Sequence, residues 1–115
     1  MVIERFQVGP RMSQAVAYNN TVYLAGVIAD DETADVTGQT EQILAKIDAL
    51  LAEAGTDKSR LLSANIWLAD IATFNEMNVA WDGWVTPGNP PVRATVESKL
   101  ARPELKVEIM VVAAR

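Results

Sequence analysis

The chain has 115 residues, a formal net charge of −5, no cysteine and no histidine, and its length predicts a single domain spanning residues 1–115. The missing side chains exclude disulfides, thiolate nucleophiles, the usual Ser-His-Asp triad and the usual zinc site, and the acidic balance argues against a nucleic-acid binder. No signal pattern and no apolar stretch of bilayer-spanning length is found, so we expect a cytoplasmic protein.

Three strands are predicted at the start of the chain. Residues 2–6 alternate weakly between apolar and polar side chains, as an edge strand does, and Gly9-Pro10 ends this segment. Residues 15–18 and 22–25 flank Asn19-Asn20, two residues that tolerate the left-handed conformations of a tight turn. The last two segments are therefore predicted to form a β-hairpin.

A long helix is predicted over about residues 36–54. Asp35 or Thr37 can cap its first turn, and Gly55 stands where a left-handed residue ends many helices. Apolar residues recur at helical spacing along the segment and form one stripe. This stripe consists of Ile43, Leu44, Ile47, Leu50 and Leu51.

A second, shorter helix is predicted to begin at Thr73. Thr73 and Glu76 have the spacing of a capping box, in which each side chain satisfies a backbone N–H of the other. The prolines within residues 86–91 end this helix. Trp81 is interpreted as a core residue and Trp84 as flanking a pocket or an interface. The apolar face of the helix comprises Phe74, Met77, Trp81 and Val85.

Strands are predicted at residues 61–68, 92–98 and 106–113. The order strand, hairpin, helix, strand, helix, strand, strand predicts an α+β domain with one mixed sheet and two helices packed on one face. The other face of the sheet then needs cover. Since 50% of the residues are hydrophobic, either a well-packed monomer or a cyclic oligomer fits, and we favour the oligomer.

Arg93 is the first candidate for a functional residue. Pro90-Pro91 fixes the entry into its strand, and the period-2 geometry of a strand puts Arg93, Thr95 and Glu97 on one face. An arginine held in this way suits bidentate capture of a carboxylate. The alternative is an exposed arginine paired with an acid such as Glu97 or Glu108.

Glu108 is the second candidate, because it interrupts an apolar strand. A buried carboxylate there needs a partner. It could hold Arg93, position a water, or carry a proton if its pKa is raised; the alternative is an outward-facing Glu in an otherwise buried strand. Gly26, directly after a strand, either lets a ligand approach the backbone or marks a bend.

Short segments along the whole chain are typical, in their order, of one protein family. They are Gly9-Pro10 and residues 13–16, 22–26, 37–40, 53–55, 65–70, 74–78, 91–96 and 107–109. With them the chain resembles the RidA/YjgF family over nearly its full length. The resemblance implies a chorismate-mutase-like fold and a homotrimer in which the sheets form a central barrel, with sites in the clefts between subunits.

The resemblance also implies an activity. Family members with the arginine hydrolyse reactive imino acids, of the 2-iminobutanoate and 2-iminopropanoate type, to 2-keto acids and ammonia, without a cofactor or metal. Arg93 matches the carboxylate-binding arginine of the family, and Glu108 the glutamate associated with the reacting water. Thr95, Asn78 and the backbone of Ala25-Gly26 match positions of the pocket wall.

The chain departs from the family pattern at the pocket. Arg11-Met12 follows Gly-Pro where an aromatic residue is common, Ala25 replaces a serine, and Val27-Ile28-Ala29 stands for Gln-Ile-Pro. The changes indicate a divergent subgroup and leave the substrate open. The main alternative function is a non-catalytic trimer that binds a small carboxylate as a metabolite sensor; ribonuclease activity, also attached to this family, fits the acidic charge poorly.

Overall fold

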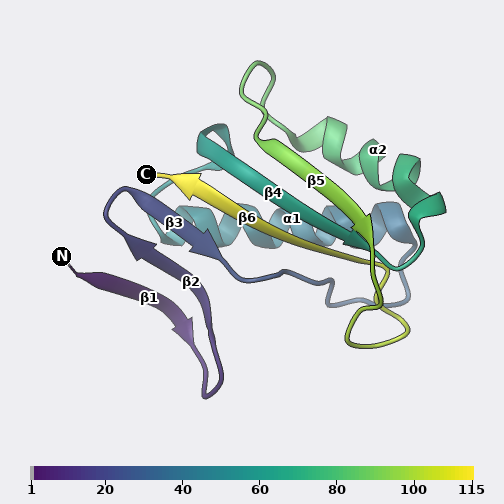
Figure 1. Cartoon of the computed structure of the whole chain (residues 1–115), viewed down its shortest axis with the longest axis horizontal. Helices are drawn as coiled ribbons and strands as arrows, with labels where there is room; N and C mark the ends of the chain where they lie inside the picture. The colour runs from purple at the N-terminus through teal and green to yellow at the C-terminus, as the bar shows by residue number, and fades with distance from the viewer. Residues whose placement is uncertain (1) are drawn as a thin grey trace.

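The computed structural model describes residues 2–115, in which six strands form one sheet in the order β1-β2-β3-β6-β4-β5 (Figure 1). The strands are β1 (Ile3–Val8), β2 (Ser13–Tyr18), β3 (Thr21–Leu24), β4 (Leu61–Leu68), β5 (Val92–Glu97) and β6 (Val107–Ala114). The helices are α1 (Val36–Glu53) and α2 (Phe74–Trp84). Strands β4 and β5 run parallel and all other neighbouring strands antiparallel, so the predicted α+β fold with a mixed sheet is confirmed.

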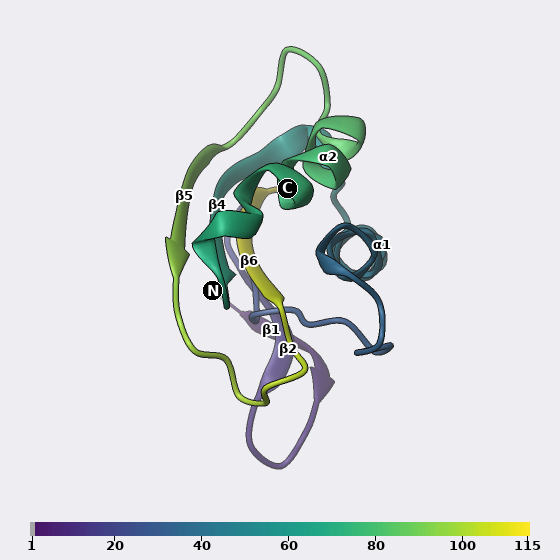
Figure 2. The same cartoon turned by 90° about the vertical axis from the view of Figure 1, so that its right-hand side faces the viewer.

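Both helices lie on the same face of the sheet (Figure 2). As a consequence, one face of the sheet is covered and the other is open. In strand β6, in the middle of the sheet, buried residues accordingly alternate with partly exposed ones. Val107, Ile109 and Val111 are fully buried toward the helices. The intervening side chains, among them Glu108 and Met110, lie on the open face, which no helix covers.

The open face is rich in apolar side chains. Tyr23 of β3, Val96 of β5 and Met110 of β6 are 46%, 50% and 37% exposed. The register places Tyr23 opposite Val112 and Met110 opposite Asn65, and Trp67 of β4 lies between Glu108 and Val96. Tyr23, Met110 and Val96 therefore share one face, spread over β3, β6, β4 and β5. Exposed apolar groups so close together favour a covering partner.

Both ends of α1 have the predicted caps. The carboxylate of Asp35, rather than the hydroxyl of Thr37, accepts from the backbone N–H of Gly38 at 2.8 Å. At the other end Gly55 has φ of +86° and the N–H of Thr56 donates to the carbonyl of Leu51 at 2.9 Å, which closes the helix with a left-handed residue. The Thr37 hydroxyl instead donates to the carbonyl of Glu76 at 2.8 Å and ties α1 to α2.

The predicted capping box of α2 is wrong, although the helix does begin directly after Thr73. A one-turn 3₁₀ helix, Ile71–Thr73, precedes α2 and leaves Thr73 with φ of −89° and ψ of 11°, whereas a capping side chain needs an extended backbone. The Thr73 hydroxyl therefore turns back and donates to the carbonyl of Asp70 at 2.6 Å. Asp70 caps the 3₁₀ helix by accepting from Ala72 N–H at 2.9 Å.

The two tryptophans of α2 are buried, as expected for Trp81, while Trp84 belongs to the packing between the helices. Its indole N–H donates to the carboxylate of Asp48 on α1 at 3.0 Å and 3.1 Å. Phe74, expected on the apolar face, is 37% exposed. Within residues 2–115 no helix has both the length and the apolar character that a bilayer span requires.

Candidate functional site

Arg93 lies on the helix face of β5 and reaches α2. The register pairs it with Ala64 of β4, a residue buried under the helices, so both side chains point the same way. Its Nη1 donates to Oδ1 of Asn78 at 2.8 Å. Its guanidinium carbon lies 5.6 Å from the centre of the Phe74 ring and 5.2 Å from that of Trp81.

Arg93 is half-buried, and no carboxylate of the described chain forms an ion pair with it. Burial lowers the pKa of Arg93, and the charge of nearby Asp82 works in the opposite direction. The alternative that Arg93 pairs with Glu97 or Glu108 is therefore wrong. Glu97 instead accepts from the backbone N–H of Ile71 at 3.1 Å.

Thr95 shares the face of Arg93, as the strand periodicity predicts. It pairs with Ile66, another residue buried toward the helices. Its Oγ1 is buried and has no hydrogen-bond partner within residues 2–115. A buried hydroxyl without a partner is costly, and two residues along a strand it lies roughly 7 Å from the Arg93 backbone. The hydroxyl is thus an unsatisfied buried group on the same face of the sheet as Arg93.

Glu108 lies on the other face of the sheet. It pairs with Trp67 of β4 and is half-buried between two fully buried neighbours, Val107 and Ile109. The structure therefore supports the alternative in which Glu108 faces outward from an otherwise buried strand. The idea that Glu108 holds Arg93 in place is wrong for a single chain, because the sheet separates the two side chains.

Gly26 makes room for Glu108. A β-carbon at Gly26 would lie 3.0 Å from the carboxyl carbon of Glu108 and closer still to Oε2, so a larger residue here would push the Glu108 carboxylate away from its observed position. Ala25, next to it, is held by its N–H donating to the carbonyl of Gln14 at 2.9 Å. The group that approaches the backbone of Gly26 in the single chain is the Glu108 side chain, so the approach of a ligand to Gly26 stays a prediction.

A cavity of about 440 Å³ lies beside Gly26, between the β1–β2 hairpin and the second half of α1. Its walls include Met12 from the hairpin, Gln14, and the ion pair of Lys46 with Asp30. Met12, which follows the Gly-Pro pair, therefore shares a cavity wall with Gly26. Nowhere in the described chain do three or more Asp or Glu side chains gather closely enough to hold a metal ion.

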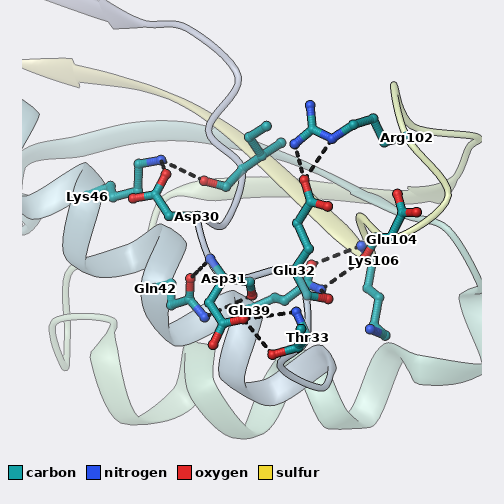
Figure 3. A network of polar contacts seen from close by, with 11 residues as sticks. Asp30, Asp31, Glu32, Thr33, Gln39, Gln42, Lys46, Arg102, Glu104 and Lys106 are labelled. Atoms are coloured by element: carbon teal, nitrogen blue, oxygen red, sulfur yellow. Dashed lines mark hydrogen bonds and ion pairs between the residues drawn. The ribbon is translucent and has the colours of Figure 1, made fainter.

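A network of polar contacts fixes two backbone segments, one that follows Gly26 and one that precedes Glu108 (Figure 3). The side chain of Gln39, fully buried on α1, donates to the carbonyls of Glu32, Ala34 and Glu104 at 3.1–3.2 Å and accepts from Lys106 N–H at 2.9 Å. Lys46 reaches back to the carbonyl of Ile28 at 2.8 Å. Loops far apart in sequence are thus held against α1.

The sequence-predicted residues form two groups in one chain. The helix-side group comprises Arg93, Thr95 and Asn78, joined by Phe74 and Trp81. The open-face group comprises Ala25, Gly26 and Glu108. Sequence reasoning missed the contact of Phe74 and Trp81 with Arg93, because helical spacing assigned both rings to the core; the i, i+4, i+7 spacing of Phe74, Asn78 and Trp81 was the available indication.

Comparison with known proteins agrees with this architecture. Residues 3–115 match the model of the family described as endoribonuclease L-PSP. The RutC family protein YoaB of Escherichia coli is 47% identical over 114 residues, 99% of each chain. The Reactive Intermediate Deaminase A of Arabidopsis thaliana chloroplasts is 34% identical over 107 residues, 88% of this chain and 57% of that one.

A solved structure extends the likeness to the whole fold. The protein NMB1025 of Neisseria meningitidis, described as a member of the YjgF protein family, superposes with a TM-score of 0.97 at 43% identity, covering 100% of this chain and 96% of that one. Sequence and fold agree along the entire described chain, which confirms the resemblance found in the sequence. The chain belongs to the RidA/YjgF family, whose model bears the description endoribonuclease L-PSP.

Proposed function

We propose that the protein hydrolyses small imino acids to 2-keto acids and ammonia, with Arg93 as the anchor of the substrate carboxylate. The observation that carries the proposal is the half-buried guanidinium of Arg93, which has no carboxylate partner within residues 2–115 and lies beside the orphaned hydroxyl of Thr95. The likeness to a reactive intermediate deaminase of Arabidopsis supports the same chemistry.

Hydrolysis of an imine needs little beyond positioning. Arg93 binds the carboxylate through two parallel N–H···O bonds, and Thr95 bonds a second polar group of the substrate. A water oriented by Glu108 attacks the imine carbon, and one of its protons passes to nitrogen to give a tetrahedral carbinolamine. The hydroxyl proton then also passes to nitrogen as the C–N bond breaks, which releases ammonia and leaves the keto group. Holding water and imine in contact replaces a bimolecular encounter, which can supply much of the acceleration.

The separation of Arg93 from Glu108 requires a second copy of the chain in this mechanism. Each copy offers Arg93 on the helix face of β5, an edge strand, and Glu108 on the open face. We propose a homotrimer in which the open faces cover one another and the edge of one copy meets Gly26 and Glu108 of the next. A closed cyclic trimer then has three equivalent sites.

The test is the rate of keto-acid and ammonia formation when purified protein meets a freshly generated imino acid. We expect wild type to accelerate hydrolysis, Arg93→Ala to give only the uncatalysed rate, and Arg93→Lys to fall between them, because lysine keeps the charge but loses the bidentate geometry. A wild-type rate equal to that of Arg93→Ala would overturn the catalytic assignment.

The same site without turnover would make the protein a metabolite sensor. Saturable, Arg93-dependent binding of pyruvate without imine hydrolysis is the result that identifies this second function. RNA cleavage, suggested by the description of the family model, is opposed by the net charge of −5, because binding to RNA depends on cations that neutralise phosphates. An RNA substrate incubated with the same preparation checks this.

A further inference from the structure

We propose that Phe74, Asn78 and Trp81 form an uncharged cradle on α2 that positions the guanidinium of Arg93 and leaves its positive charge unneutralised for an anionic ligand. In this proposal Phe74 and Trp81 are positioning residues and not only part of the core. The identity of the ligand as a carboxylate rests on the proposed function; the cradle itself does not.

The three cradle residues occupy one stripe of α2, at positions i, i+4 and i+7, which is the spacing that brings side chains of a helix to the same face. Strand β5 brings Arg93 across this stripe. Asn78 accepts from Nη1 at 2.8 Å, and the two rings lie 5.6 Å and 5.2 Å from the guanidinium carbon. The guanidinium is therefore held from several sides by groups without charge.

The exposure of Phe74 supports a role outside the core. Phe74 is 37% exposed, whereas Met77 and Trp81 on the same helix are 0% and 5% exposed. Phe74 therefore lies at the edge of the core and not within it, and the face of its ring attracts the guanidinium of Arg93, 5.6 Å away. Phe74 thus contacts Arg93 in addition to packing at the edge of the interior.

The lack of charge in the cradle has a chemical consequence. Burial of a guanidinium is commonly compensated by a carboxylate, which an incoming anion must displace. Here a carbonyl oxygen and two π-faces compensate part of the burial and leave the net charge in place. Asp82, the acid whose charge acts on Arg93, forms no ion pair with it within residues 2–115. The guanidinium of Arg93 thus keeps its positive charge and is already held in position to bind a planar anion.

The first experiment observes the cradle without any ligand. In ¹⁵N-labelled protein the Arg93 Nε–Hε resonance should be shifted by the aromatic rings and slow to exchange. We expect Phe74→Leu to move it toward the position of a free arginine and to speed its exchange, while Phe74→Tyr, which keeps the ring face, restores it. Val79→Ala is the matched control, because Val79 lies on α2 but lines the groove toward α1. An unchanged resonance in Phe74→Leu would overturn the cradle.

The second experiment measures binding of pyruvate by calorimetry. We expect Phe74→Leu to weaken binding about three- to tenfold and Val79→Ala to leave it unchanged. Asn78→Asp has nearly the same shape but puts a carboxylate on Arg93; it should weaken binding at least about tenfold while the melting temperature stays equal or rises. Unaltered binding in both cradle variants would refute the cradle and leave the proposed function standing. Absence of pyruvate binding in wild type would count against the proposed function. The cradle would then still be tested by the Arg93 resonance of the first experiment.

Discussion

A methyl group at Gly26 would collide with the carboxylate of Glu108, and this single contact ties the loop after β3 to the reactive carboxylate of the proposed mechanism. The carboxylate of Glu108 lies where a side chain at position 26 would be, so this position of the carboxylate depends on the absence of a side chain there. The position of Glu108 is thus set by a glycine more than 80 residues away in sequence.

We expect Gly26→Ala to lower kcat at least about tenfold with little change in KM, because it displaces the group that orients water and leaves Arg93 untouched. Steady-state kinetics with the imino acid check this. The matched control is Gly83→Ala on α2, where an added β-carbon meets no atom within 4 Å. Activity retained in Gly26→Ala would show that the observed place of the Glu108 carboxylate is not required.

Thr95 offers a prediction in which stability and function change in opposite directions. Thr95→Val keeps the shape of the side chain but removes the buried hydroxyl that lacks a partner in the described structure. We expect the unligated protein to gain about 1 kcal/mol in free energy of unfolding, and kcat/KM to fall several-fold since a substrate contact is lost. Denaturant unfolding and kinetics on one preparation test both. Lower stability of the variant would mean that the hydroxyl is satisfied without substrate.

At the scale of elements, α1 does more than cover the sheet. Gln39, buried in its first turn, forms hydrogen bonds with two loops that lie about seventy residues apart in the chain. One side chain thus joins the segment before α1 to the entry of β6. These carbonyls and the N–H of Lys106 lie partly away from water and would lose their partner together if the amide were removed.

We expect Gln39→Leu to destabilise the protein by about 2–4 kcal/mol, because each buried polar group left without a partner costs about 1–3 kcal/mol. Gln42→Leu, on the same helix, is the control: Gln42 bonds only the exposed backbone of Asp31, and its loss should cost less than about 1 kcal/mol. Urea unfolding of the two variants measures the difference. Equal costs would refute the special role of the buried amide.

At the scale of the whole molecule, the two site groups on opposite faces predict complementation between inactive variants. Arg93→Ala and Glu108→Gln should each lack activity as pure proteins. In a cyclic trimer that contains both variants, one of the three interfaces combines an intact Arg93 with an intact Glu108, so about a third of wild-type activity should return. Co-expression with two different tags and purification over both gives the mixed trimer.

The result that would contradict a shared site is a mixed oligomer without recovered activity although each parent variant folds. Recovered activity in a preparation that stays monomeric by analytical ultracentrifugation would also contradict it. In the expected case, exposed apolar residues of the open face, such as Tyr23 and Met110, are covered in the assembly.

Much of the fold could be read from the chain because the deciding interactions are local. The apolar stripe of α1, its cap at Asp35 and the left-handed Gly55 involve residues within a few turns of one another. The shared face of Arg93 and Thr95 follows from strand periodicity alone. The prediction of a capping box at Thr73 is wrong, and the cause is also local. In the 3₁₀ turn before α2 the Thr73 hydroxyl donates to the carbonyl of Asp70 and does not cap α2.

Periodicity, the missing Cys and His, and the order of the elements were determined by the sequence itself, as was the choice of Arg93 and Glu108 as candidates. Only the tertiary structure decided that these two lie on opposite faces. That outcome depends on the register of β4 with both neighbours, which pairs Ala64 with Arg93 and Trp67 with Glu108. A shift of one residue exchanges the faces of a strand, and such register is set by packing between distant segments. The same packing, not helical spacing, put Phe74 over Arg93.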